Sequence, residues 1–252
     1  MQILADLHNH SCLSPCGSLE LSPRVLAETA AEKAVKVLAL TDHNTSLNCP
    51  AFAFHCKRLG IIPFFGVEVT TREEVHILSL YAALDAALAF GEYIYSIITP
   101  LPNNPDKTGD QVYVDENDNI EGELEFFLSI AAEIGIDELG KKAAEFGGIV
   151  IPAHVDRPAF SMTSQLGAVV PGPWAALECV RIPPLADYAS KEILPTLGFP
   201  LITGSDAHYT EHVGRRPFEL DITPEELLPN GPEADADLHS LKKALELCPR
   251  GQ

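Results

Sequence analysis

The chain has 252 residues, 46% of them hydrophobic, and carries 17 basic against 36 acidic side chains, a formal net charge of −19. This length and apolar content suit one large α/β barrel domain. Such an acidic surface disfavours long nucleic acids, whose binding depends on basic side chains that release counterions from phosphates. It leaves small phosphorylated substrates open, because bound metal ions would reverse the local field. We therefore expect a small phosphorylated substrate and no long nucleic acid.

The N-terminus and the cysteines indicate a cytoplasmic protein. Residues 1–8 run directly into a polar motif and lack the apolar segment of a signal peptide. No apolar run is long enough to span a membrane, so we expect no membrane partner. The six cysteines are too sparse for a disulfide scaffold, and reduced thiols are expected at positions 12, 16, 49, 56, 179 and 248.

Strands and helices alternate through the first part of the chain. Residues 3–7 and 35–40 are predicted as buried strands. Between them, Ser22 and Pro23 mark the N-cap and the first residue of a helix that continues to residue 33. A second helix, over 52–59, ends at Gly60. The apolar runs that follow predict strands over 61–65, 67–70 and 75–81.

The middle of the chain, residues 84–137, is predicted as an insertion of short helices and a turn-rich loop. It contains three prolines followed by the polar run 107–123. Its acidic stretch, 115–119, lacks the ligand spacing of a calcium-binding loop. We therefore expect a solvated loop there.

Regular alternation returns after the insertion. Helices are predicted over 136–146, 187–197, 224–228 and 234–247, and strands over 149–153, 176–182 and 200–203. Repeated alternation of strand and helix predicts a parallel α/β barrel that takes in residues 1–252 as a single domain. In such barrels the active site lies at the C-terminal ends of the strands.

Histidines and acids gather at the ends of these apolar runs. They are His8, His10, His43, His76, His154 and His208, with Asp6, Asp42, Glu68 and Asp206. Imidazoles and carboxylates collected at one end of a barrel can hold several divalent metals. Residues two apart in a strand face the same way, so His8 and His10 can reach one cation. The pattern indicates metal-assisted hydrolysis.

Three motifs in this order are highly specific: Asp-Leu-His-Asn-His at 6–10, Thr-Asp-His-Asn at 41–44 and Gly-Ser-Asp-Ala-His at 204–208. Together with Glu68, His76 and His154 they resemble the polymerase-and-histidinol-phosphatase (PHP) family. The resemblance implies a distorted seven-stranded (β/α) barrel with a trinuclear metal site at the C-terminal ends of the strands.

Residue by residue, the resemblance implies three metal positions. The first would be held by His8, His10, Glu68 and Asp206, the second by Glu68, His76 and His154, and the third by His43 and His208. The remaining ligand of the third site is commonly Asp or His in the family, whereas Cys16 stands there in this chain. A thiolate binds zinc or iron well and manganese poorly. The implied cofactors are two or three divalent ions of zinc, manganese or iron.

Such a site predicts a metal-dependent phosphoesterase in which metal-activated hydroxide attacks a phosphomonoester or nucleotide. The sequence shows no recognisable serine or cysteine nucleophile motif. Asp206 and His208 are expected to assist proton transfer. Arg157, three residues after His154, is expected to bind the substrate phosphate, because a guanidinium can grip it through two hydrogen bonds.

Other charged residues near the motifs have weaker predictions. Asp6 and Asp42 adjoin ligands in the sequence and are expected to orient imidazoles or backbone from outside. Arg215 and Arg216 follow the last motif and could bind substrate or form a structural salt bridge. His55 has no acidic companion in its helix and is expected to be structural or exposed.

Three alternatives remain open from the sequence. An exonuclease or oligonucleotide hydrolase would use the same metal chemistry. An amidohydrolase-like enzyme would need a bridging lysine where Glu68 stands. A non-catalytic metal-binding module would be marked by lost ligands, and only Cys16 departs from the family pattern.

Overall fold

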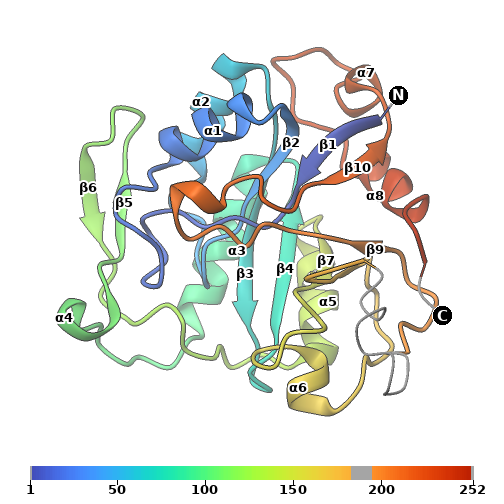
Figure 1. Ribbon diagram of the computed structural model, residues 1–252. Coiled ribbons are helices and arrows are strands. Elements are labelled where there is room, and N and C mark those ends of the chain that lie inside the picture. The colour runs from blue at the N-terminus through green and yellow to red at the C-terminus, as the bar shows by residue number, and fades with distance from the viewer. Residues whose placement is uncertain (1, 183–194, 251–252) are drawn as a thin grey trace.

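A six-stranded mixed sheet organises the molecule, and the computed structural model describes residues 2–182 and 195–250 (Figure 1). The sheet order is β10-β1-β2-β3-β4-β7. The strands are β1 Gln2–Asp6, β2 Val35–Leu40, β3 Ile62–Thr70, β4 His76–Tyr81, β7 Ile149–Pro152 and β10 Phe218–Asp221. The helix predicted over 187–197 lies, except for its last three residues, outside the described part of the chain.

The sheet is mixed rather than parallel. Strands β1, β2 and β3 run parallel, whereas β10 pairs antiparallel with β1, and β4 pairs antiparallel with both β3 and β7. The short turn 71–75 joins β3 to β4, and a parallel pair would need a far longer crossover. The α/β class is confirmed, but the predicted seven-stranded (β/α) barrel is not: the described residues form a curled sheet of six strands.

A second, smaller pair of strands continues the curl. Strand β8, Leu177–Glu178, runs parallel to β9, Leu201–Ile202. Isolated bridges link this region to the main sheet, from Val150 to Trp174 on one side and from Asn9 to Ala207 on the other. The chain that follows β9 therefore returns to the end of β1.

Four helices cover one face of the sheet with a shared apolar core: α1 Pro23–Glu32, α2 Cys49–Leu59, α3 Leu84–Ser96 and α5 Ile136–Glu145. Helix α1 begins where predicted, because the Ser22 side chain accepts a hydrogen bond from the backbone N–H of Val25. Helix α2 ends at Gly60, whose φ of 65° suits glycine. Buried Phe90 places α3, the start of the predicted insertion, in this core.

A second core lies inside the curl. Ile62 and Phe64 of β3 belong to it, and by the alternation of a strand Glu68 faces the same side. Helix α8, Leu238–Glu246, supplies Leu241 and Leu245 to this inner core. Apolar side chains therefore fill the interior of the curled sheet. The polar side chains of β3 occur only near the C-terminal end of that strand.

The rest of the predicted insertion forms a hairpin beside the sheet. After the short helix α4, Pro105–Thr108, strands β5, Val112–Val114, and β6, Ile120–Glu123, pair antiparallel and project to one side (Figure 1). The acidic stretch is the hairpin turn, in which Asp115 accepts hydrogen bonds from the backbone of Asn117 and Asn119.

The remaining short elements are α6, Met162–Leu166, the 3-10 helix η2, Thr210–His212, and α7, Pro224–Leu227. Within residues 2–182 and 195–250, no helix combines the length and apolar character that a membrane crossing requires.

Candidate metal centre

Glu68 lies at the centre of a group of five imidazoles. Its carboxylate oxygens are 3.2 Å from His8 Nε2, 3.2 Å from His10 Nε2, 3.1 Å from His43 Nδ1, 2.9 Å from His76 Nδ1 and 3.3 Å from His154 Nε2. All six side chains are buried. The structure thus gathers on one carboxylate residues that lie as far apart in the sequence as positions 8 and 154.

Asp206 supplies a second carboxylate to the same group. Its Oδ1 lies 3.5 Å from His8 Nε2, 3.3 Å from His10 Nε2 and 3.4 Å from His208 Nδ1. Its Oδ2 accepts a hydrogen bond of 2.8 Å from Arg157 Nη1. Glu68 and Asp206 therefore share the first two imidazoles.

Several of these buried atoms have no hydrogen-bond partner: both carboxylate oxygens of Glu68, Nδ1 of His43 and His76, and both ring nitrogens of His154. Buried polar atoms in proteins are almost always hydrogen-bonded, so a cluster of unpaired ones fits a site that binds cations. Two ligands at about 2.1 Å from a tetrahedral zinc ion lie about 3.4 Å apart, close to the separations found here. Three overlapping groups could each hold an ion: His10, His43 and His208; His8, His10 and Glu68; and His43, Glu68 and His76.

The strand directions explain why these side chains meet. Most of them follow the C-terminal end of a strand: His8 and His10 follow β1, His43 follows β2, His154 follows β7, and Asp206 and His208 follow β9. Glu68 lies near the C-terminal end of β3. His76 instead begins β4. Because β4 runs antiparallel to β3, its first residue lies at the same edge as Glu68, and Thr70 is its direct partner.

The loops that carry His154 and Asp206 have strained backbone. His154 and Asp206 have positive φ angles of 31° and 47°, a region that residues other than glycine rarely adopt. The strained 204–206 loop is held by hydrogen bonds from Arg215 Nε and Arg216 Nη2 to the carbonyl of Ser205, of 2.7 and 3.1 Å. In this structure both arginines bind loop carbonyls.

Asp42 is linked to His10 and His43 indirectly, through the side chain of Ser14. The Ser14 hydroxyl donates to Asp42 Oδ1 at 2.7 Å and lies 3.0 Å from His10 Nδ1 and 3.2 Å from the backbone N–H of His43. A hydroxyl has one proton, so here it must accept from both of the latter groups. His10 Nδ1 therefore carries a proton that it donates to Ser14, and Nε2 is the ring nitrogen that faces the centre.

Glu178 of β8 is a residue that the sequence motifs did not identify. Its Oε2 accepts a hydrogen bond of 2.8 Å from His8 Nδ1, and both side chains are buried. A Cβ at Gly204 would lie 2.7 Å from Glu178 Oε2, so this close approach requires glycine. In the sequence, Glu178 could be noticed only as a single acidic residue within the predicted strand 176–182. Asp6 contributes differently, since its Oδ1 accepts from the backbone N–H of Ser205.

The histidines differ in the direction of their pKa shifts, because burial disfavours the charged ring whereas the two carboxylates favour it. Burial lowers the pKa of His43 and His76, and lowers that of His208 to about 4. Burial also opposes a charge on His10, but the neighbouring carboxylates of Asp206 and Glu68 raise its pKa to about 9. The first three are neutral imidazoles at physiological pH, the form that a metal binds.

The imidazoles around Glu68 favour the ionised form of its carboxyl. Burial would raise the pKa of its carboxyl, but His76, His8 and His43 hold that pKa well below its usual value. A carboxylate ligand must be deprotonated to bind a metal, so Glu68 is in the required form.

A cavity of about 300 Å³ opens onto the cluster. It is lined by Cys16, His43, Glu68, His76, Phe127, Ser129, Arg157, Phe160, Asp206 and His208. Cys16 reaches the cavity, but among the described residues it joins none of the three groups of ligand atoms. Burial, followed by the nearby Glu68 and Asp206 carboxylates, raises the pKa of its thiol to about 12. His55 is remote from the cavity and pairs with the Glu116 carbonyl.

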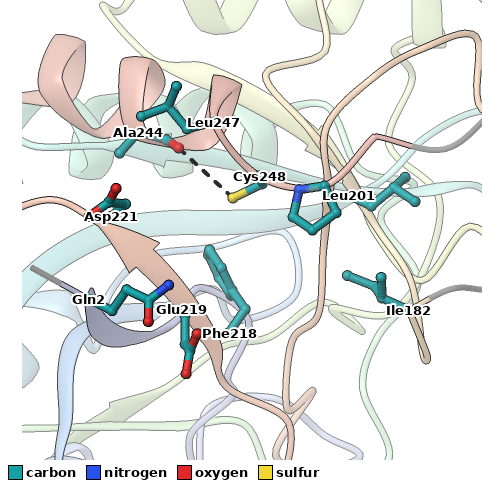
Figure 2. A pocket seen from close by; sticks show the side chains of 10 residues that line it. Gln2, Ile182, Leu201, Phe218, Glu219, Asp221, Ala244, Leu247 and Cys248 are labelled. Atoms are coloured by element: carbon teal, nitrogen blue, oxygen red, sulfur yellow. Dashed lines mark hydrogen bonds between the residues drawn. The ribbon is translucent and has the colours of Figure 1, made fainter.

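Another cavity, of about 580 Å³, lies at the opposite end of β1, between β10, β9 and α8 (Figure 2). Its charged side chains are Glu219 and Asp221, and the described residues that line it include no imidazole. It therefore lacks the ligand set of the first cavity.

The fold and the side-chain cluster together describe an α/β protein with a buried group of imidazoles and carboxylates able to bind metal ions. Residues 6–121 match the family model of the PHP domain, so the resemblance predicted from the motifs is confirmed. The matched region contains five of the converging side chains described above: His8, His10, His43, Glu68 and His76.

One protein is similar to part of this chain in sequence, and two solved structures are similar to it in fold. The 5'-3' exoribonuclease Rnm of Salmonella typhimurium is 36% identical over 85 residues, which are 31% of this chain and 27% of that protein. A lesion-specific endonuclease Q from Pyrococcus furiosus superposes on all of this chain and 57% of its own, with a TM-score of 0.61 and 19% identity. A protein assigned as a metal-dependent phosphoesterase from Bifidobacterium adolescentis has a TM-score of 0.56 and 17% identity, over 95% of this chain and 94% of its own.

The prediction that long nucleic acids are excluded is wrong. The relative that shares 36% identity is an exoribonuclease, and an endonuclease Q with the same fold has been solved with a 27-mer DNA duplex bearing an abasic lesion at its active site. Net charge is a sum over the whole surface, whereas the field at a metal site depends on the ions held there. A charge of −19 therefore does not exclude nucleic acid from this site.

Proposed function

We propose that the protein is a metal-dependent phosphoesterase. The observation that carries this proposal is the convergence of five imidazoles on the buried, ionised Glu68 carboxylate, with several of their polar atoms left without hydrogen-bond partners. A buried polar cluster of this kind is costly unless cations complete it.

Two or three divalent ions of zinc, iron or manganese would occupy the site. The proposed ligands are His8, His10, Cys16, His43, Glu68, His76, His154, Asp206 and His208. When bound, the ions would polarise a phosphoryl oxygen and lower the pKa of water, which is the chemistry that phosphoester hydrolysis requires. Cys16 would complete the third site only after its side chain moves toward His43 and His208, and a thiolate there would favour zinc or iron.

The chain's own residues would orient the substrate. Arg157 extends from the loop after His154, and its side chain is 40% exposed at the cavity. One guanidinium nitrogen binds Asp206, which leaves other N–H groups for a phosphate oxygen. Asp206 and His208 line the same cavity, where either can accept a proton from the attacking water.

A nuclease is the second candidate, with a phosphodiester as the bond that is broken. The match to an exoribonuclease over 85 residues favours it, as does the fold shared with endonuclease Q. Monoester and diester hydrolysis need the same cations and differ in what the cavity and its surroundings accept.

The test is hydrolysis of a substrate panel by the full chain loaded with zinc, iron or manganese. The panel contains phosphomonoesters, 5'-labelled single-stranded RNA and DNA, and a DNA duplex with an abasic site. Loss of an outer partner of a metal ligand already costs 10- to 100-fold, so Glu68→Gln should reduce turnover and bound metal by more than about 100-fold. Glu219→Gln, at an exposed residue of β10, is the matched control. Undiminished activity in Glu68→Gln would refute the proposed mechanism.

A further inference from the structure

The cavity above the metal ligands has an aromatic wall. Two phenylalanines from separate segments line it, Phe127 from the stretch after β6 and Phe160 from the loop after β7. Phe160 remains 39% exposed although it is a large apolar residue. The other lining residues are mostly proposed ligands, with Arg157 and Ser129 as additional polar groups. An apolar surface therefore adjoins the place proposed for the phosphate.

Phe160 is fixed in an unfavourable conformation. Its φ of 54° is rare for a bulky residue and persists only where the surroundings impose it. Its carbonyl accepts a hydrogen bond of 3.0 Å from the backbone N–H of His76. Its ring stacks on the His76 ring, with centroids 4.8 Å apart and planes inclined by 18°. The aromatic ring is thus held in register with a proposed metal ligand.

The segment that carries Phe127 is tied to the loop that carries His43. Asn44, which follows His43, donates through Nδ2 to the carbonyls of Leu128 and Ile130, both at 2.7 Å. The backbone N–H of Phe127 donates to the Leu101 carbonyl at 2.8 Å. Phe160 is therefore attached to His76, and the Phe127 segment to the loop of His43, so both rings have a defined position relative to proposed ligands.

We propose that Phe127 and Phe160 form a stacking subsite for the group esterified to the phosphate, so that the enzyme prefers phosphoesters whose leaving group carries a planar ring, such as a nucleobase. This inference rests on the proposed phosphoesterase function. A cavity of about 300 Å³ is at the small end of ligand sites and admits one such ring-bearing unit at a time. Stacking of one base on an aromatic side chain changes affinity by about 5- to 150-fold.

Matched substrates isolate the contribution of the ring. Benzyl phosphate and cyclohexylmethyl phosphate have similar leaving groups, and only the first has a planar ring. Adenosine 5'-monophosphate and ribose 5-phosphate contain the same scissile bond with and without the base. If only diesters are cleaved, an oligonucleotide with a terminal base is compared with one whose terminal nucleotide is abasic. The measured quantity is the ratio of kcat/KM within each pair.

Two variants remove one ring at a time, Phe160→Leu and Phe127→Leu. Phe160→Gly is added because glycine tolerates the positive φ, so this variant should fold even if the leucine variant does not. The control is Phe54→Leu, an exposed aromatic on α2 that does not line the cavity. The wild type and this control should prefer the ring-bearing member by about 5- to 150-fold. In the Phe127 and Phe160 variants this ratio should fall toward one.

Binding separates failure of the inference from failure of the proposed function. Benzylphosphonate and cyclohexylmethylphosphonate cannot be hydrolysed, and calorimetry measures their affinities for the metal-loaded protein. In one outcome no ester is cleaved, yet benzylphosphonate binds more tightly than cyclohexylmethylphosphonate and Phe160→Leu removes this difference. That outcome would refute the phosphoesterase function and support the stacking subsite. Equal kcat/KM and equal binding within every pair would refute the subsite. A ring preference that both leucine variants retain would also refute it.

Discussion

At the scale of single residues, the outer partners of His8 and His10 decide which ring nitrogen faces the centre. Glu178 accepts from Nδ1 of the first ring and Ser14 from Nδ1 of the second. Both rings consequently direct Nε2 toward Glu68 and Asp206. A carboxylate behind a histidine also makes the ring a stronger ligand.

Replacing Glu178 should therefore weaken metal binding. We expect Glu178→Ala to lower the affinity of the first metal by about 10- to 100-fold, because the His8 ring loses its orientation. Glu178→Gln should lower it less, since the amide oxygen still accepts from Nδ1. Competition with a chromogenic chelator measures both constants. Equal affinity in the wild type and the alanine variant would show that Glu178 does not position His8.

The residues that converge on Glu68 could be recognised in the sequence, but the residues that hold them in place only in part. His8, His10, His43 and Asp206 stand in short motifs that follow apolar runs, so strand prediction alone brings them to one edge. Asp42 was expected to orient a ligand, although its route through Ser14 is a three-dimensional relation. Glu178 has no neighbouring motif. Its role depends on β8 packing between β7 and β9, and short-range patterns do not determine that placement.

At the scale of elements, the hairpin of β3 and β4 supplies the central part of the site. Glu68 pairs with Leu78 and Thr70 with His76, so the register of this hairpin sets the distance between Glu68 and His76. A slip by one residue would turn one of them away from the centre. Gly66 allows the two strands to approach closely, since a Cβ there would lie 2.6 Å from the Ser79 carbonyl oxygen.

Gly66→Ala should therefore strain the hairpin without touching a ligand. Overpacking of this kind costs about 1–3 kcal/mol, because the Ser79 carbonyl belongs to backbone and cannot rotate away. Chemical denaturation measures the free energy of unfolding, and metal content reports the effect on Glu68. An unchanged free energy of unfolding would show that the strands separate freely at this point.

The sequence predicted most elements but not how all of them pair. Gly66 was interpreted as a break between two strands, yet β3 continues through it from Ile62 to Thr70. Residues 218–221 were not predicted as a strand, although β10 covers one edge of β1. Strand direction was also missed, because the apolar pattern of a buried strand is the same for parallel and antiparallel pairing.

At the scale of the whole molecule, the proposed ions would link segments from both ends of the chain. Ions that bind only the folded state stabilise it, by about 2.7 kcal/mol when free metal is 100 times the dissociation constant. For a protein of this size that corresponds to about 5–11 °C in Tm. Chelation should lower Tm by this amount and added metal should restore it, as scanning calorimetry would show. The shift should be smaller in Glu68→Gln, and a Tm insensitive to chelator in the wild type would contradict the linkage.

Metal uptake should also release protons. The pKa of His10 in the metal-free protein is about 9, so the ring is protonated at pH 7.5 and must lose this proton to bind a cation. Affinity should therefore rise with pH up to about 9. Calorimetric titration in two buffers of different ionisation enthalpy measures the number of protons released. Identical apparent enthalpies in both buffers would contradict this expectation.

The return of the last ligand loop to β1 has a consequence for biosynthesis. Backbone hydrogen bonds join Asp206 N to His8 O and His10 N to Ala207 O. A ribosome makes His8, His10 and Glu68 long before Asp206 exists, and until then the nascent polypeptide presents imidazoles without their second acid. Binding of the proposed cations could therefore be completed only after translation has passed this loop, and truncated products that end before it would bind them less tightly.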